Sequence, residues 1–291
     1  MQIVSWNVNS LRARCEHVTS FLKTYAPDVL LLQETKVIDA LFPREVFEDL
    51  GYNVAVFGQK SYNGVAILSK RPLEEITYGL SCVAPKETPV RYESVCLKGQ
   101  GEEAISSLRS VDTVFSEARY IQAFTKGIWV ASVYVPNGDS VGHEKYVAKL
   151  AFLKALKAHV QTQLLCEDVF VLGGDFNVAP SARDVYDPKI WNDAHILTST
   201  LERQAYRELL HQKLIDPVAF ERPVSDHTSF TWWDYRTRGF ENERGLRIDH
   251  LLVSPEAYDL YEKTVVYSEE RAKERPSDHA PVAVFLNSSL Q

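Results

Sequence analysis

Hydrophobic residues in this chain fall into short runs rich in valine, isoleucine and aromatic side chains, and polar stretches containing Gly, Pro, Asn or Asp separate them. Runs of this length and composition are typical of β-strands, and the separating residues are typical of turns. The pattern predicts strands over residues 2–8, 29–33, 52–57, 64–69, 75–78, 120–124, 128–135, 169–172, 229–233, 247–253, 264–267 and 282–286.

Helical spacing is less frequent. Val18, Phe21, Leu22 and Tyr25 recur at intervals of three and four residues before Pro27, as expected of a helix with one apolar face. Because strands outnumber helices, we expect a layered α/β sandwich in which two packed sheets carry helices on their outer faces. The other predicted helices cover residues 46–50, 144–165 and 203–213.

Residues 81–116 depart from this pattern. The region is polar and weakly patterned, apart from one candidate strand over residues 90–97. An inserted hairpin with its loop and a mobile segment are both compatible with such a stretch.

Polar side chains stand where several predicted strands begin or end. Glu34 follows the run 29–33, Asp175 follows the run 169–172 after two glycines, and Asp278 precedes the run 282–286. If these strand ends meet at one rim, their negative charges repel, and protons or a divalent cation must neutralise them. Oxygen ligands favour Mg²⁺ or Mn²⁺ over zinc.

Each polar cluster also has an ordinary structural explanation. Asp175 and Asn177 suit a turn that closes a strand, and Glu34 suits a solvated loop start. Asn7 and Asn9 alternate along a strand, where asparagine is rare unless its amide is satisfied. The clusters lie at both ends of the chain, so a shared site predicts that residues 1–291 form one domain.

An aspartate–histidine pair is a second candidate for chemistry. His279 opens the last predicted strand, and Asp249 lies within another. Asp249 facing His279 would orient the imidazole, fix its tautomer and favour its protonated form, whereas the alternative is a structural hydrogen bond. Tyr134 ends a strand and could reach the same rim, although a tyrosine there more often serves packing. His250 is more readily explained by packing.

Aromatic and cationic residues alternate between Phe230 and Arg247. A surface of this kind suits backbone phosphates and an unstacked nucleotide. Alternatively, the aromatic residues belong to the core and the arginines pair with nearby acidic residues.

Composition narrows the setting. The chain has 291 residues, 45% of them apolar and 24% charged, which is ordinary for a globular protein. The four cysteines lack paired spacing, which argues against a zinc site or a disulfide framework. A formal net charge of −7 leans slightly against a polyanionic partner, although a binding face needs only a local excess of cations. Neither a leader peptide nor a membrane span is evident, so we expect a cytoplasmic protein without a membrane partner.

The clusters, taken in order, resemble the exonuclease III class of apurinic/apyrimidinic endonucleases, within the endonuclease/exonuclease/phosphatase superfamily. The likeness covers nearly the whole chain, and the region 81–116 looks longer than the family's usual connection. The motifs that carry the resemblance are Trp6-Asn7, Gln33-Glu34-Thr35-Lys36, Tyr62-Asn63-Gly64-Val65-Ala66, Tyr134-Val135-Pro136-Asn137-Gly138, Gly174-Asp175-Phe176-Asn177, Trp232-Trp233-Asp234-Tyr235-Arg236, Gly245-Leu246-Arg247-Ile248-Asp249 and Ser277-Asp278-His279-Ala280-Pro281.

This resemblance implies a four-layered α/β sandwich of two mixed β-sheets flanked by helices. It implies an enzyme that uses Mg²⁺, or Mn²⁺ in its place, to cleave the phosphodiester 5′ to abasic sites in duplex DNA. It also implies removal of nucleotides or blocking groups from 3′ ends, and we expect a monomer. The alternatives are a superfamily phosphodiesterase or phosphatase acting on RNA or inositol phosphates, and a non-catalytic DNA-binding protein.

The resemblance also assigns roles to residues. Glu34 would be the principal metal ligand, while Tyr134 and His279 would stabilise charge on the phosphate. The general base stays open between Asp175 and the Asp249–His279 pair. The expected metal site comprises Asn7, Glu34, Asp175, Asn177, Asp278 and His279, with Asn9 nearby, and the expected catalytic residues are Tyr134, Asp175, Asn177, Asp249 and His279.

The expected contacts with DNA divide into an apolar pocket and a set of arginines. Trp232, Leu246 and Ile248 would wall a pocket that admits a flipped sugar lacking its base and excludes an intact nucleotide. Binding through the arginines would weaken steeply with salt. The cationic contacts implied by the family are Arg119, Arg236 and Arg247.

Overall fold

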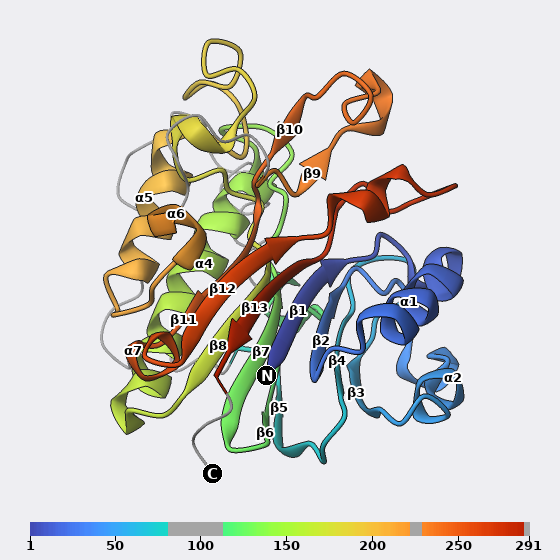
Figure 1. Ribbon diagram of the computed structural model, residues 1–291. Coiled ribbons are helices and arrows are strands. Elements are labelled where there is room, and N and C mark those ends of the chain that lie inside the picture. The colour runs from blue at the N-terminus through green and yellow to red at the C-terminus, as the bar shows by residue number, and fades with distance from the viewer. Residues whose placement is uncertain (81–112, 222–228, 288–291) are drawn as a thin grey trace.

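Two β-sheets lie face to face in the centre of the molecule, with helices on both outer sides (Figure 1). The computed structural model describes residues 1–80, 113–221 and 229–287. The first sheet has the order β12-β13-β1-β2-β4-β3. Its strands are β1 (Gln2–Asn7), β2 (Val29–Gln33), β3 (Asn53–Phe57), β4 (Val65–Ser69), β12 (Tyr261–Val266) and β13 (Val282–Leu286).

The second sheet has the order β11-β8-β7-β6-β5, and a short ribbon of β9 and β10 stands apart from both sheets. The β1–β2 and β7–β8 pairs are parallel and the other pairs are antiparallel, so both sheets are mixed. The strands are β5 (Glu74–Tyr78), β6 (Tyr120–Thr125), β7 (Ile128–Tyr134), β8 (Phe170–Asp175) and β11 (Asp249–Val253), with β9 (Trp232–Trp233) and β10 (Gly245–Leu246) in the ribbon.

Strands buried on both faces explain the continuous apolar runs of the sequence. In β2, Val29 and Leu31 point toward the second sheet, whereas Leu30 and Leu32 pack on the opposite side of the same strand. Alternation with a period of two residues therefore supplies two apolar layers from one strand.

Helices cover the outer faces through their own apolar sides. In α1 (Leu11–Tyr25), Val18, Phe21 and Leu22 pack on the first sheet, and in α4 (Glu144–Gln163) a comparable stripe packs on the second. The layers are thus helix, sheet, sheet and helix, and the predicted four-layered sandwich is confirmed. Other helices with both ends in the described residues are α2 (Arg44–Glu48), α5 (Thr200–Leu210), α6 (Pro217–Glu221) and α7 (Pro255–Tyr258), with short 3₁₀ turns at Asp39–Leu41, Leu164–Cys166, Ala182–Asp184, Tyr235–Thr237 and Ser268–Ala272.

Several predicted boundaries were wrong. The strand predicted over 229–233 is reduced to Trp232–Trp233, and the strand predicted over 247–253 starts at Asp249, because the chain first pairs as the separate β10. The helix predicted over 203–213 runs over Thr200–Leu210. It begins three residues before the predicted start, because Ser199 caps its N-terminus. The candidate strand over 90–97 and most of the region 81–116 lie outside the described residues.

Among the residues that the structure describes, no helix is both long and apolar enough to cross a membrane. Of the described cysteines, Cys15 and Cys166 are free thiols.

Candidate metal-dependent active site

Register places three polar side chains in one row across the second sheet. Asp175 at the end of β8 lies opposite Tyr134 of β7 on one side and opposite Asp249 of β11 on the other. Residues directly opposite each other in a sheet project from the same face. Val171, four residues before Asp175, and Leu251, two residues after Asp249, pack between the sheets. The row therefore faces the first sheet, at the end where the apolar layer between the sheets gives way to polar groups.

The first sheet brings Asn7 and Glu34 to the same rim. Asn7 ends β1, and its Nδ2 donates to Glu34 Oε1 and to Asp175 Oδ2, both at 2.9 Å. Glu34 follows β2 with a left-handed backbone, φ 51°. A non-glycine residue in this region is strained, and such strain is concentrated at functional sites. Glu34, Asp175 and His279 offer ligating atoms within 4.8 Å of one another, so the structure brings these three side chains together at one rim.

His279 enters this rim from the turn before β13. Its Nδ1 lies 2.9 Å and 3.1 Å from the two carboxylate oxygens of Asp249, and its Nε2 lies 3.8 Å from Asp175 Oδ2. Burial lowers the pKa of His279, but the adjacent carboxylates of Asp249 and Asp175 outweigh burial and raise the pKa to about 10. The pair holds a charged imidazole with one N–H directed at the rim, as predicted for Asp249 and His279.

Asp175 is buried among acidic groups. Burial, with the nearby charges of Asp249 and Glu34, raises the pKa of Asp175 to about 7, against the opposing effect of His279. Asn177 stabilises this carboxylate through its backbone N–H, which donates to Asp175 Oδ1 at 2.9 Å. The Nδ2 of Asn177 donates to the Val135 carbonyl at 2.9 Å and to Asp175 Oδ2 at 3.3 Å.

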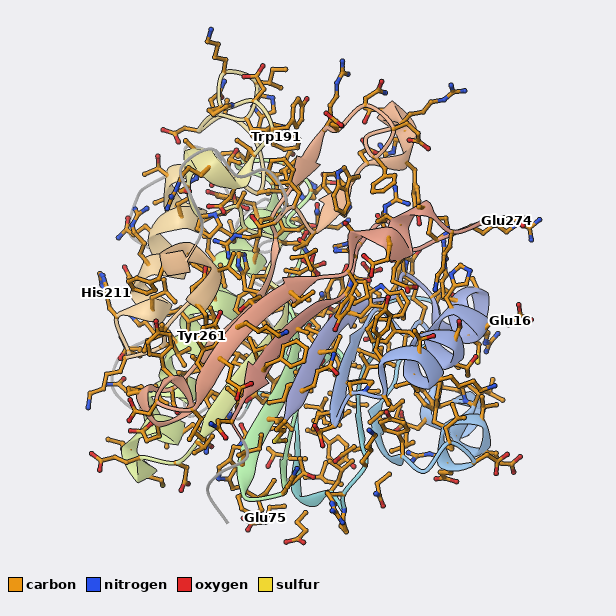
Figure 2. All side chains as sticks on the ribbon, in the orientation of Figure 1. Glu16, Glu75, Trp191, His211, Tyr261 and Glu274 are labelled. Carbon is orange, nitrogen blue, oxygen red and sulfur yellow. The ribbon has the colours of Figure 1, made fainter. Side chains whose placement is uncertain are left out.

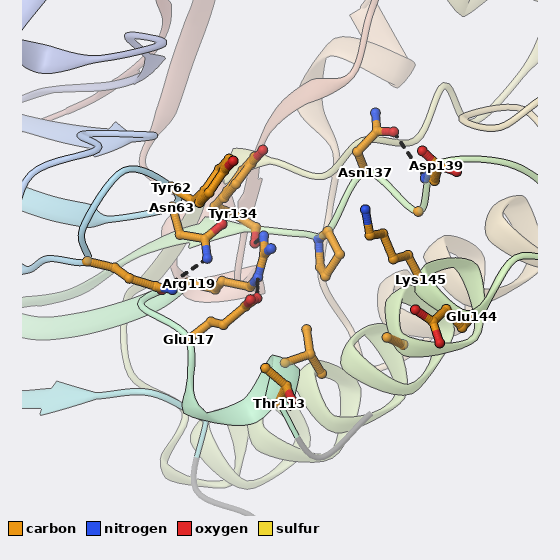
Figure 3. A pocket seen from close by; sticks show the side chains of 15 residues that line it. Tyr62, Asn63, Thr113, Glu117, Arg119, Tyr134, Asn137, Asp139, Glu144 and Lys145 are labelled. Atoms are coloured by element: carbon orange, nitrogen blue, oxygen red, sulfur yellow. Dashed lines mark hydrogen bonds and ion pairs between the residues drawn. The ribbon is translucent and has the colours of Figure 1, made fainter. Parts of the chain in front are cut away.

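Tyr134 and Arg119 line the same end of the second sheet. Burial and the charges of Glu34 and Asp175 raise the pKa of Tyr134, so its hydroxyl stays protonated and can donate. The Arg119 guanidinium lies 4.9 Å from the Tyr134 ring centroid and pairs with Glu117 at 2.5 Å. Both side chains border a cavity of about 650 Å³ that opens beside the rim, toward Tyr62 and Lys145 (Figure 3).

Asp278 is held slightly apart from the central group. Its Oδ1 accepts from Asn9 Nδ2 at 2.9 Å and its Oδ2 accepts from Trp232 Nε1 at 3.1 Å. Although burial raises the pKa of Asp278, the charge of His279 and these hydrogen bonds hold it below its usual value. Both carboxylate oxygens already have partners, and among the described residues the ligating group of acidic and histidine side chains contains Glu34, Asp175 and His279 without Asp278.

An apolar patch adjoins the rim. Leu246 and Ile248 are buried in one cluster, and Trp232, which is partly exposed, packs against them. Trp191 belongs to the same cluster and lies at the end of the molecule from which β9 and β10 extend, opposite to the end marked by Glu75 (Figure 2). The three predicted pocket residues are thus brought together.

The arginines predicted to contact DNA differ in their surroundings. Arg236 is exposed on a 3₁₀ turn after β9. Arg247, in contrast, is only 2% exposed, and its guanidinium donates to Asp184 Oδ1 at 2.7 Å and to Asp216 Oδ2 at 2.8 Å. A buried guanidinium that is paired twice does not reach a phosphate at the surface, so the expected contact of Arg247 with DNA does not agree with the structure.

Part of the aromatic segment has a structural role. The Arg271 guanidinium carbon lies 5.2 Å from the Tyr235 ring centroid, 5.1 Å from that of Phe240 and 6.0 Å from that of Trp233. These cation–π contacts attach the ribbon of β9 and β10 to the turn Ser268–Ala272. The alternative explanation, in which aromatic residues serve packing, therefore applies to these three rings.

Sequence reasoning missed several residues that support the site. Lys36 pairs with Glu34 at 2.7 Å and donates to Asn9 Oδ1 at 2.6 Å, and Asn137 donates to Asn177 Oδ1 at 3.2 Å. Lys149 is wholly buried beneath this region. A signal for Lys149 was present, because it stands on the apolar face of its predicted helix, between Tyr146 and the buried leucines that follow.

Comparisons with known proteins agree with this geometry. The model of the Endonuclease/Exonuclease/phosphatase family matches residues 4–279. Exodeoxyribonuclease III of Haemophilus influenzae is 31% identical over 97% of this chain and 98% of its own length. An AP endonuclease from Archaeoglobus fulgidus has a TM-score of 0.83 and 32% identity, covering 98% of this chain and 99% of that one. A 3′ phosphatase from Neisseria, in complex with a product DNA hairpin, has a TM-score of 0.84 and 35% identity, covering 99% of each chain.

Proposed function

The chain belongs to the Endonuclease/Exonuclease/phosphatase family, in its exonuclease III class, and on this premise we propose that it is a DNA repair hydrolase that depends on Mg²⁺. It cleaves the phosphodiester on the 5′ side of abasic sites in duplex DNA, and it removes nucleotides or blocking groups from 3′ ends. The observation that supports this most strongly is the rim where Glu34, Asp175 and His279 converge. We further propose that residues 1–291 form a single domain that acts as a cytoplasmic monomer.

The donor set suits a hard divalent cation. Glu34 and Asp175 present carboxylate oxygens, and Asn7 orients both by donating from its amide nitrogen, while its amide oxygen accepts from the Asn9 N–H at 3.0 Å. No cysteine lies among the ligating side chains of the described residues. Such a set favours Mg²⁺ or Mn²⁺ over zinc. Glu34 is the principal ligand, with the Asp175 carboxylate next to it. The cation, when bound, supplies Lewis acidity toward the phosphate oxygens.

His279 is better suited to donate a proton than to ligate a metal. Its Nδ1 is committed to Asp249, so Nε2 is the one ring nitrogen that faces the rim. The charged ring can donate to a phosphate oxygen as negative charge accumulates there, and the Tyr134 hydroxyl can donate in the same way.

Asp175 is the better candidate for the general base. With the His279 ring already charged, Asp175 is the acidic group at the rim whose pKa of about 7 lies near neutral pH. A base matched to the working pH is the most efficient. Asp175 therefore orients the attacking water and accepts its proton. Asn177 Nδ2 donates to the Val135 carbonyl and to Asp175 Oδ2, so Asn177 Oδ1 is the atom that accepts from the water.

Substrate choice follows from the apolar patch. Trp232 is the partly exposed member of this cluster and suits the apolar face of a sugar that has lost its base, while the buried side chains of Leu246 and Ile248 pack behind it. Arg119 beside the rim and exposed Arg236 supply positive charge for backbone phosphates.

The test is cleavage of a labelled duplex that carries one abasic site, with an intact duplex, a recessed 3′ end, RNA and an inositol polyphosphate in parallel. We expect incision 5′ to the abasic site in Mg²⁺, loss of incision in chelator, and loss in Glu34→Gln but not in Glu48→Gln, which alters an exposed residue of α2. Faster turnover of RNA or of the inositol phosphate would refute the DNA repair assignment.

A further inference from the structure

A buried ion pair lies directly beneath the rim. Lys149 of α4 and Glu202 of α5 are both fully buried and bonded to each other. The Lys149 ammonium also donates to the carbonyl oxygen of Asn177 at 2.7 Å and to that of Asn137 at 3.0 Å. A lysine ammonium has three N–H groups, so all three are used by one carboxylate and two carbonyls.

The two carbonyls belong to the loops that carry the site. Asn177 follows β8 and Asn137 follows β7, and the Asn137 amide donates to Asn177 Oδ1 at 3.2 Å. Asn177 has a left-handed backbone, φ 51°, which a non-glycine residue keeps only when its surroundings enforce it. Lys149 supplies such a constraint, because its ammonium donates hydrogen bonds to the Asn177 carbonyl and to the Asn137 carbonyl in the neighbouring loop.

Packing of Gly138 against the Lys149 side chain adds to this constraint. Gly138 has φ 98°, and a Cβ added there would lie 3.1 Å from Lys149 Cδ and 2.8 Å from Ile196 Cδ1. The loop after β7 thus lies in close contact with the lysine side chain.

Glu202 is fixed by partners other than the lysine. Its Oε1 accepts from the Leu197 N–H at 3.0 Å, and its Oε2 accepts from Ser199 Oγ at 2.6 Å, in the capping box of α5. The carboxylate is therefore a rigid anchor for the ammonium. Simple packing would not need this arrangement, since a buried charge is costly and an apolar side chain would fill the space.

We propose that Lys149, anchored by Glu202, is a positioning residue that sets the orientation of the Asn177 and Asn137 amides for catalysis. The proposal rests on the proposed function, in which Asn177 contacts the water. Because Lys149 acts through Asn177 and touches no substrate, its loss affects kcat and leaves KM nearly unchanged.

The test compares Lys149→Met with Lys157→Met. Lys157 pairs with Glu208 between the same two helices at 2.9 Å, but this pair is partly exposed and lies away from the rim, so it is a matched control. We expect Lys149→Met to lower kcat on the order of 100-fold, as misplacement of a reacting geometry by about 1 Å does, and Lys157→Met to leave it unchanged. Lys149→Arg restores part of the loss.

A double variant separates positioning from folding. Lys149→Met with Glu202→Gln removes both charges and keeps an acceptor for the cap of α5, so we expect this variant to fold even if the single one does not.

In an Asn177→Ala background, the change at Lys149 should lower kcat little further, because its effect passes through Asn177. An equal kcat in the Lys149 and Lys157 variants, or a full additional loss in the Asn177→Ala background, would overturn the proposal.

A readout without substrate keeps this test independent of the proposed function. The side-chain amide NMR signals of Asn177 and Asn137 should shift in the Lys149 variants and stay in place in Lys157→Met. If these NMR signals shift but the native protein cleaves no abasic DNA, only the proposed function is refuted. If the signals do not move in the Lys149 variants, the positioning role is refuted.

Discussion

The buried histidine next to Arg247 makes stability depend on pH in a calculable way. His250 Nε2 lies 2.9 Å from the Val178 carbonyl, to which it donates, and His250 Nδ1 accepts from Arg247 at 3.0 Å. A proton on Nδ1 would bring two hydrogen-bond donors together, the His250 Nδ1–H and the Arg247 N–H. Burial and the charge of Arg247 lower the pKa of His250 to about 4, although Asp216 and Asp184 oppose this.

The sign follows from linkage. The unfolded chain, with an ordinary histidine pKa of about 6.5, binds a proton at higher pH than the folded chain does, so stability falls as pH falls from about 6.5 toward 4. At about 1.4 kcal/mol per pKa unit, the neutral His250 contributes roughly 3 kcal/mol to the free energy of unfolding. About 2 kcal/mol of this contribution is lost by about pH 5.

The assay is urea unfolding of the native protein and of His250→Asn at about pH 7.5 and about pH 5. Asparagine keeps an acceptor for Arg247 and cannot titrate. Between these two pH values the native protein should lose about 2 kcal/mol more of its free energy of unfolding than the variant loses. An equal loss in both proteins would show that His250 does not stay neutral when folded, and would refute this reasoning.

Three further predictions concern the charged groups. Arg247→Met should lower the free energy of unfolding by about 3–5 kcal/mol in urea titrations, because Asp184 and Asp216 lose their buried cation, and a loss below about 1 kcal/mol would contradict this. Asp175→Asn should lower kcat on abasic DNA by about 10²–10⁴-fold with an unchanged circular dichroism spectrum, and an active variant would exclude it as the base. Arg236→Ala should reduce the slope of log affinity against log salt by about 1, whereas an unchanged slope would remove Arg236 from the phosphate contacts.

The central rim was predictable because local sequence marks strand ends. Glu34 and Asp175 each follow an apolar run, and a buried strand fixes where the next side chain goes. Asp249 and His279 were paired correctly for a similar reason, since Asp249 begins β11 and His279 closely precedes β13.

Other features depend on partners that are distant in sequence. Arg247 looked like a surface cation because aromatic and basic residues surround it in the sequence, yet Asp184 and Asp216, 63 and 31 positions away, enclose its guanidinium. The two oxygens of Asp278 are taken by Asn9 and Trp232, which no local pattern indicates. Periodicity shows which face of an element is buried, but it does not show which polar groups meet there.

The central claim, that Glu34 holds a cation beside Asp175, is tested most directly by diffraction from crystals soaked in Mn²⁺. We predict an anomalous peak within coordination distance of a Glu34 carboxylate oxygen and on the Asp175 side of the rim, and no such peak in Glu34→Gln crystals. A peak elsewhere in the native crystals, with none at Glu34, would contradict the account.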